Sequence, residues 1–513
     1  MKKIYFFIMT CIVLSQCVLA QEPADALRYS WTVPAGTARQ QAIGGAMTSL
    51  GGDISATYIN PAGIGFYKTG DFVLSPAYNF LNNKSTYRSR TEKDNKNSFS
   101  FGTSGIVMGW QGNRGRSHAF SLAINRTGNF NSNVLYRGEN NQNSYSQKFL
   151  EEIKNNNLGD PNAVASNFPF GTSLAFNTYW IDTIAGGSGT NYQFQTRAPI
   201  ATGLLQENTI TNKGGVTEFA LAGATNYNDK FYIGGTIGIP VLRYEKNAVF
   251  TEADATTNTG NKFDFATFSE QLTTKGVGIN LKAGIIYKPV EYIRLGLAFH
   301  SPTLFSLTDQ YSASVTTNTE GYQGTQTQTS EFVSGTSGPS QFKYQLVTPY
   351  RIIVSAAYVL REIEDVKKQK GFLTADIEYV NYKASSFQPE TQNGTDQSTN
   401  DYLKLLNKAI DNAYKGAFNF RVGGELKFTT IMVRAGAAYY GNPYKNIAGE
   451  KGNRLLLSGG LGYRNKGMFV DLSYVHNIIK DVHAPYRLQS TPYSIANIKG
   501  MGGNVVLTVG FKI

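Results

Sequence analysis

The chain has 513 residues, a net charge of +12, and 31 residues each of tyrosine and phenylalanine. Its two cysteines, Cys11 and Cys17, both lie near the amino terminus, so a mature chain cut after them has no disulfide, cysteine zinc site or thiol nucleophile. No later run approaches the ~18 apolar residues of a membrane-spanning helix, and the basic residues are too dispersed for a nucleic-acid-binding face.

A signal peptide is predicted at the start of the chain. Two lysines precede an apolar run over residues 4–14, and Val18 and Ala20 supply modest and small side chains at the −3 and −1 positions of a signal peptidase site. We therefore expect residues 1–20 to be removed. An uncleaved anchor and a lipoprotein modified at Cys17 are the alternatives.

Residues 21–71 show no periodic hydrophobic pattern and are rich in small residues and turns. The most compact turn sequence is Asn60-Pro61-Ala62-Gly63, in which the proline fixes its own φ and the glycine permits a tight bend. Such a segment is suited to fold inside a wider structure and fill it.

From residue 72 onward, apolar and polar residues alternate with the period of a strand. Within 277–288, for example, Val277, Ile279 and Leu281 share one face, whereas Lys282 lies on the other. Most of the predicted strands are close to the ~9–11 residues that a tilted membrane strand needs, and their number, fourteen, is even. They cover 72–80, 98–110, 118–126, 217–227, 231–244, 277–288, 293–300, 350–360, 372–382, 418–428, 431–440, 455–463, 468–475 and 504–513.

Short and long connections alternate along the chain. The short ones include turns such as 228–230 and 429–430, and only 361–371 is a little longer. This sorting is typical of membrane barrels, which have short periplasmic turns and long extracellular loops, whereas a secreted β-sandwich has no reason for it. We therefore predict an all-β fold over 72–513, a 14-stranded antiparallel transmembrane β-barrel of the bacterial outer membrane. The main extracellular loops are expected at 127–216, 245–276, 301–349 and 383–417.

Two of the long loops contain helical patterns. Residues 146–157 and 401–415 are predicted as helices, and the second places Leu403, Leu406 and Ile410 on one face. These helices could cover the barrel mouth or simply decorate its surface. The last strand, 504–513, ends with an apolar face that includes an aromatic residue, as barrel assembly signals do.

The segment 38–66, with its Gly44-Gly45-Ala46, Gly51-Gly52-Asp53 and Asn60-Pro61-Ala62-Gly63 sequences, resembles the N-terminal hatch of the FadL/TodX family. The fourteen strands extend this resemblance over most of the mature chain, although the long loops match nothing in that family. The resemblance implies a monomeric barrel with a hatch over 21–71 inside the lumen. It also implies a lateral exit by the third strand, here about 118–126.

The function implied is outer-membrane transport of hydrophobic molecules, chiefly long-chain fatty acids, by gated diffusion with hatch movement and lateral exit. The alternatives are uptake of an aromatic hydrocarbon or haem, and a role in a secretion or surface-attachment complex. We expect no enzyme activity, no cofactor and no metal, because the chain lacks a catalytic constellation and its four histidines lack metal-ligand spacing. The expected partners are the ligand, outer-membrane lipid and lipopolysaccharide, with no nucleic acid.

The candidate site residues fall into two groups. Asn60, Pro61, Ala62 and Gly63 are expected to shape the hatch. Charged residues on the polar face of the strands could instead meet a ligand in the lumen, or satisfy one another and the hatch. The candidate lumen charges are Arg294, Arg351, Arg421 and Glu425.

Overall fold

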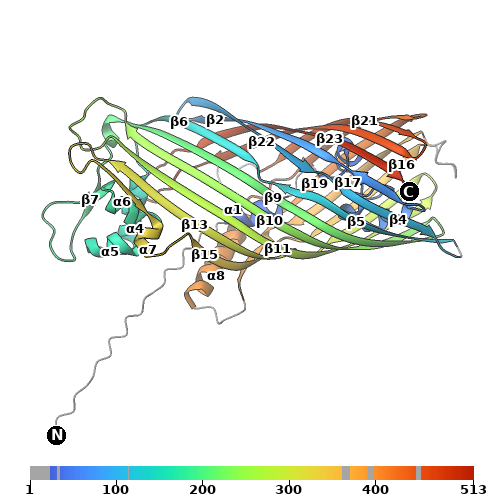
Figure 1. The fold of residues 1–513 in the computed structure, drawn as a ribbon, viewed down its shortest axis with the longest axis horizontal. Helices are drawn as coiled ribbons and strands as arrows, with labels where there is room; N and C mark the ends of the chain where they lie inside the picture. Colours follow the sequence, from blue (N-terminus) through green and yellow to red (C-terminus); the bar gives the residue numbers. More distant parts are fainter. Residues whose placement is uncertain (1–22, 32–34, 114, 361–369, 391–396, 446–451) are drawn as a thin grey trace, which may run out of the picture.

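The computed structural model describes residues 23–31, 35–113, 115–360, 370–390, 397–445 and 452–513, so the predicted signal peptide lies outside the described residues. One antiparallel sheet closes on itself as a barrel, because β1 and β2 at its start both pair with β23 at its end (Figure 1). None of the described helices is long and apolar enough to cross a bilayer.

The barrel wall is crossed fourteen times, as predicted. Eight crossings are single strands: β9 (Leu204–Tyr227), β10 (Phe231–Asp254), β11 (Phe265–Val290), β19 (Gly416–Phe428), β20 (Ile431–Tyr440), β21 (Arg454–Asn465), β22 (Met468–His483) and β23 (Ala496–Lys512). Six crossings are interrupted: β1 (Asp71–Leu74) with β2 (Pro76–Tyr87), β3 (Arg90–Phe101) with β4 (Ser104–Gln111), β5 (Arg116–Asn129) with β6 (Ser132–Asn140), β12 (Ile293–His300) with β13 (Leu304–Asn318), β15 (Ser340–Val347) with β16 (Arg351–Leu360), and β17 (Gly371–Asn381) with β18 (Ser386–Pro389).

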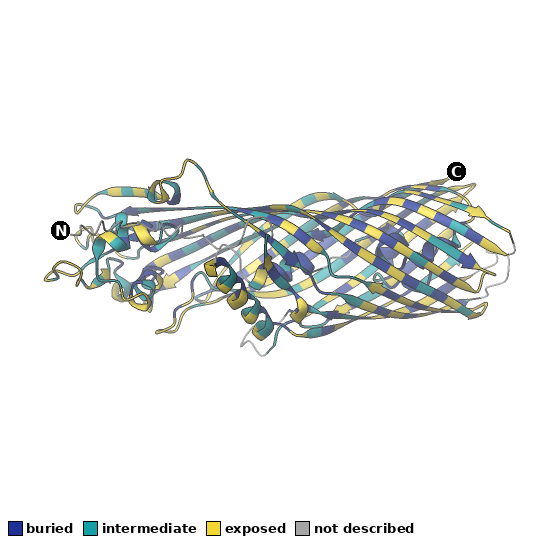
Figure 2. Ribbon diagram, turned by 90° about the horizontal axis from the view of Figure 1, so that it is seen from below, coloured by how far each residue is buried: buried dark blue, intermediate teal, exposed yellow. Residues whose placement is uncertain are grey.

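The two faces of the wall differ as a membrane barrel requires. Along β11, Val277, Ile279 and Leu281 are exposed on the outside, while Asn280 and Lys282 are buried on the inside. Figure 2 shows the same alternation of exposed and buried residues along many strands of the wall. An apolar outside with a polar inside places the barrel in the outer membrane, where lipid covers the exposed side chains.

Several strands extend well beyond their predicted ends. β10 and β11 have 24 and 26 residues, so much of the segments expected as loops at 127–216, 245–276 and 301–349 is strand. Alternation of apolar and polar residues marks only the part of a strand that faces lipid. Where the hairpins rise above the membrane, water or other loops cover their outer face and the sequence pattern fades.

A small cap folds at the end where the long loops gather (Figure 1). Its helix α4 (Ser146–Asn155) confirms the helix predicted at 146–157. Five further elements of the cap, each of seven residues or fewer, were not predicted from the sequence. The cap also contains α5 (Pro161–Asn167), α6 (Thr172–Asn177), α7 (Ser330–Ser334), and the hairpin of β7 (Ile181–Thr183) with β8 (Phe194–Thr196). Other short elements of the long loops are η2 (Ile200–Thr202), β14 (Thr325–Thr329) and η4 (Tyr382–Ala384).

The helix α8 (Gln397–Ala413) overlaps the second predicted helix, 401–415. Its buried residues include Leu403, Leu406 and Ile410, which are the predicted apolar face. They pack in one cluster with the hatch residue Leu27 and with inward side chains of the wall. The helix therefore packs against the hatch and the inward side chains of the wall, and is not an unattached surface helix.

The amino-terminal segment folds inside the barrel as a hatch. It consists of α1 (Pro23–Ser30), α2 (Ala38–Ala42), α3 (Ala56–Ile59) and the 3-10 helix η1 (Pro61–Phe66). Most of its residues are buried although it has little core of its own, because inward side chains of the wall surround it.

Candidate functional site: the lumen between hatch and barrel

The Asn60-Pro61-Ala62-Gly63 turn fastens the hatch to the wall. The Asn60 side-chain amide donates to Thr48 O at 2.7 Å and to Ile285 O of β11 at 3.1 Å, while its Oδ1 accepts from Ala62 N at 3.1 Å. Asn60 thus caps η1 and ties it both to the hatch and to the wall. At Gly63, a side-chain Cβ would lie 2.9 Å from the Ala56 Cβ, so glycine is required for close packing.

Wall glycines make room for this turn. A Cβ on Gly234 would lie 2.5 Å from the carbonyl carbon of Pro61, and one on Gly284 would lie 1.8 Å from Asn60 Oδ1. The next residue, Gly235, faces outward and has no atom closer than 3.8 Å to such a Cβ. The inward glycines of β10 and β11 therefore let the hatch backbone contact the wall directly.

The structure places all four candidate lumen charges inside the barrel. Glu378 of β17 pairs with Arg421 of β19, and it lies 3.5 Å from Arg351 of β16. The carboxylate is fully buried and also accepts a hydrogen bond from Asn419 at 3.0 Å. One carboxylate thus holds two arginines at the wall of the lumen.

A second group lies nearer the short turns. Arg434 is buried between Glu425 and Asp471, at 2.6 Å from each, and Arg39 of the hatch reaches Glu425 at 3.4 Å. Arg294 instead donates to the hatch carbonyl of Leu50 at 2.6 Å. Most of these charges satisfy one another or the hatch, as one of the two sequence-based alternatives proposes.

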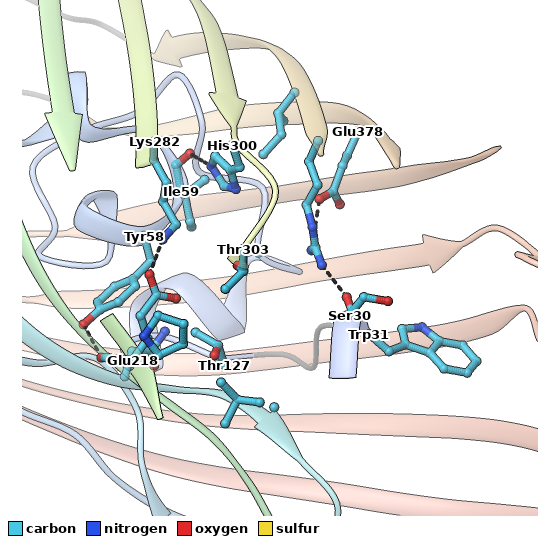
Figure 3. A pocket seen from close by; sticks show the side chains of 18 of the residues that line it. Ser30, Trp31, Tyr58, Ile59, Thr127, Glu218, Lys282, His300, Thr303 and Glu378 are labelled. Atoms are coloured by element: carbon cyan, nitrogen blue, oxygen red, sulfur yellow. Dashed lines mark hydrogen bonds and ion pairs between the residues drawn. The ribbon is translucent and has the colours of Figure 1, made fainter. Parts of the chain in front are cut away.

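A cavity of about 180 Å³ lies between the hatch and the barrel wall (Figure 3). The hatch contributes aromatic side chains to it, including Tyr29, Trp31 and Tyr58, and the wall contributes apolar groups such as Phe305 and Leu456. Its polar lining includes Asn125, Thr127, Asn280, Lys282, Thr303, Arg351, Glu378 and Arg421. The cavity lining therefore combines apolar side chains, neutral polar side chains and a few groups of charged side chains.

Glu218 pairs with Lys282 at the cavity wall and was not among the residues expected there from the sequence. Its alternation with the buried Ala220 and Ala222 was the signal that could have placed it inside. Tyr58 of the hatch lies against this pair, with its hydroxyl 2.7 Å from Ala123 O. Burial and the Glu218 carboxylate raise the pKa of Tyr58, so its hydroxyl stays a neutral donor.

His300 also lines the cavity, and its Nε2 lies 2.8 Å from Ile59 O of the hatch (Figure 3). The ring thus joins β12 to the residue that precedes the Asn60 turn. Among the described residues no group of three or more histidine, cysteine, aspartate or glutamate side chains could hold a metal ion.

The wall has a seam beside the third crossing, meaning a stretch where two neighbouring strands are not joined by a ladder of backbone hydrogen bonds. β4 pairs with β5 only as far as Ser104 opposite Ile124, and in the described part of the chain no ladder joins β3 to β5 or β6. Beyond Ile124, β5 keeps only its other neighbour, β9, and this ladder shifts register between Arg126 and Gly128. The expected exit segment, 118–126, is therefore laddered on both sides over most of its length, and the seam starts at its end.

The cavity reaches this seam. Asn125, Thr127 and Gly128 belong both to the seam and to the cavity lining. The Asn125 side chain is buried, and its Oδ1 has no hydrogen-bond partner among the described residues. Nearer the long loops, side chains bridge β6 and β3: the side-chain amide of Asn133 donates to Asn95 O at 3.1 Å.

Comparisons with known proteins identify the architecture. No protein-family model and no curated protein sequence matches the chain. A Pseudomonas aeruginosa FadL homologue matches in structure with a TM-score of 0.57 and 13% identity, over 94% of this chain and 99% of that chain. The P. putida toluene transporter TodX matches with a TM-score of 0.50 and 11% identity, over 94% and 99%. The chain therefore has the fold of the FadL and TodX transporters, a 14-stranded outer-membrane barrel with a hatch in its lumen.

Proposed function

We propose that this barrel is a FadL/TodX-type transporter that moves hydrophobic molecules across the outer membrane by gated diffusion. The observation that carries the proposal is the cavity between hatch and wall, whose lining continues to the seam beside β5. A ligand that leaves sideways through a seam enters lipid directly, so an apolar molecule need not cross water. No covalent chemistry or cofactor is needed for such a passage.

The lining favours an amphiphile, and long-chain fatty acids are the proposed ligands. Glu218, Lys282, Arg351, Glu378 and Arg421 all border the cavity. A hydrocarbon without polar atoms would cover these groups and offer no hydrogen bonds in return, which costs free energy. A ligand with a polar head can place it among these charges and lay its chain along the hatch aromatics.

The gate is proposed to be the hatch. Tyr58 and Ile59 contact two different strands of the cavity wall, β5 through Ala123 and β12 through His300. A small shift of the segment around Asn60 would therefore change the cavity at two places at once. Asn125, with its unpartnered Oδ1, is the polar group placed to guide a ligand head past the seam.

The direct test is uptake by a bacterial host that lacks its own fatty-acid channel. Expression of this barrel, with insertion checked by heat-modifiable gel mobility, should restore uptake of a labelled long-chain fatty acid more than uptake of toluene. Restored toluene uptake alone would contradict the ligand assignment. No uptake of either, together with co-purification of large secreted or surface proteins, would favour the role in a secretion or attachment complex.

A further inference from the structure

Four lysines form a row across four neighbouring strands of the outer wall. Lys93 of β3 lies directly opposite Lys84 of β2, Lys84 lies opposite Lys499 of β23, and Lys499 lies opposite Lys480 of β22. Directly opposed residues of antiparallel strands share one face, and all four of these lysines are exposed. With strands about 4.8 Å apart, the row is roughly 14 Å long.

The nearest outward neighbours of the row on its own four strands carry no acidic group. The outward residues two positions above and below it are asparagine, threonine or apolar: Thr86, Asn82, Thr91, Asn95, Asn497, Met501, Ile478 and Val482. None of the four lysines makes an ion pair with a described carboxylate. The adjacent Glu92 and Asp94 occupy the opposite face, where they contact Arg137 and Asn133 of β6.

The height of the row is set by the apolar band beneath it. Met501 and Ile478 are exposed apolar side chains two residues below Lys499 and Lys480 on the same face. Further below, Tyr78 and Phe99 contact each other at 5.6 Å between ring centroids, as interfacial aromatics do. On β22 and β23 the lysines directly follow the last exposed apolar residues, whereas on β3 Asn95 and Asn97 separate Lys93 from Phe99. The row therefore lies above the apolar band, on the side of the long loops.

Like charges directly opposite one another destabilise a sheet, so three successive lysine pairs in one row have an energetic cost. A phosphate head group at this height would remove that cost, because lysine binds phosphate as a point charge. A head group with two or more phosphates can contact several lysines of the row at once.

We propose that Lys84, Lys93, Lys480 and Lys499 form a binding site for phosphorylated glycolipid of the outer leaflet, the chemistry of lipopolysaccharide. The site lies on the outer wall and is separate from the transport cavity. It holds lipid against the strands where the barrel closes, β2, β3, β22 and β23.

The test compares matched variants of the purified barrel in detergent. The test variant carries K84Q, K93Q, K480Q and K499Q. The control carries K68Q, K230Q, K370Q and K466Q, which remove the same charge from exposed positions at the periplasmic end. Binding of bisphosphorylated lipid A is measured by native mass spectrometry, with dephosphorylated lipid A and inorganic phosphate as the comparison probes.

The wild type and the control should bind bisphosphorylated lipid A equally. The test variant should bind it at least about tenfold more weakly, because each lysine near an anionic lipid surface contributes a factor of roughly five. Equal binding by the test variant, equal binding of dephosphorylated lipid A, or equal competition by inorganic phosphate at the same phosphate concentration would each overturn the proposal.

A second measurement guards against a folding defect. In detergent without lipid and at low salt, the test variant should unfold at the same temperature as the wild type or higher, since its lysine repulsion is gone. A lower unfolding temperature would show that the lysines serve the barrel itself, and would contradict a lipid site.

Discussion

At the scale of single residues, charged side chains line the lumen. The alternation of polar and apolar residues predicts that they point inward, but it does not predict which groups they contact. The sequence places Arg294, Arg351, Arg421 and Glu425 on the polar face of their strands, and the structure has them there. The sequence could not show that Arg294 donates a hydrogen bond to Leu50 O. The hatch has no periodic hydrophobic pattern from which its position against the wall could be predicted.

Arg434, another lumen charge, has a fully buried side chain and should contribute strongly to stability. Replacing Arg434 by leucine leaves Asp471 buried without its cation and weakens the hold on Glu425. We expect a loss of about 3 kcal/mol in unfolding free energy. Urea unfolding from lipid vesicles measures it. The control is Arg243→Gln, which removes an exposed pair with Glu245 and should cost less than about 1 kcal/mol.

Gly234 and Gly235 offer a matched pair of neighbours on β10. Gly234→Val should push the Asn60 turn away from the wall, because even its Cβ would overlap Pro61. We expect the barrel to fold but the hatch to become sensitive to added protease. Gly235→Val has open space outside and should keep the wild-type digestion pattern. Equal digestion of both variants would refute the direct seating of the hatch on β10.

At the scale of elements, the predicted strands agree with the observed ones where lipid covers the wall. Where the wall rises above the lipid, the predicted strands end too early. β11 was expected over 277–288, but it starts at Phe265. The helices α4 and α8 were predicted because each has a regular apolar face. The shorter α5 and α6, with seven and six residues, are set by their packing in the cap, which no local pattern reveals.

The packing of α8 can be tested with two adjacent leucines. Leu406 is 6% exposed within the cluster that joins α8 to the hatch, whereas Leu405 is 67% exposed. Leu406→Asp should detach the helix, because a carboxylate cannot be buried there without a partner. Hydrogen exchange across 397–413 should then rise strongly, while Leu405→Asp leaves it unchanged. Similar exchange in the two variants would show that α8 is not anchored by this face.

The hatch is proposed to be a separate element within the barrel. Deleting residues 21–60 should leave a folded, heat-modifiable barrel, because the sheet closes through β1, β2 and β23 without the hatch. Its lumen should then admit small hydrophilic solutes, measured as faster antibiotic entry into cells. A deletion variant that cannot fold would show that the hatch is part of the barrel core.

At the scale of the whole molecule, three parts act together: an apolar outer wall, a cavity bounded by the hatch, and a seam where the cavity reaches the wall. The barrel and its strand number could be predicted, because alternation and the sorting of loops both depend on the membrane. The seam was expected near 118–126 only through the family resemblance, and its exact position depends on where β5 stops pairing with β4. The cavity lining could not be predicted, since it depends on how the hatch packs against strands far apart in the sequence.

Exit of ligands through the seam beside β5 is tested most directly by one uptake measurement. Thr127→Trp would fill the cavity where it meets the seam, whereas Leu122→Trp places the same bulk on the same strand facing lipid, where the ladder with β4 is intact. With both variants inserted at the wild-type level, labelled fatty-acid uptake should fall at least about tenfold for Thr127→Trp and stay unchanged for Leu122→Trp. Unchanged uptake by Thr127→Trp would contradict passage through the seam.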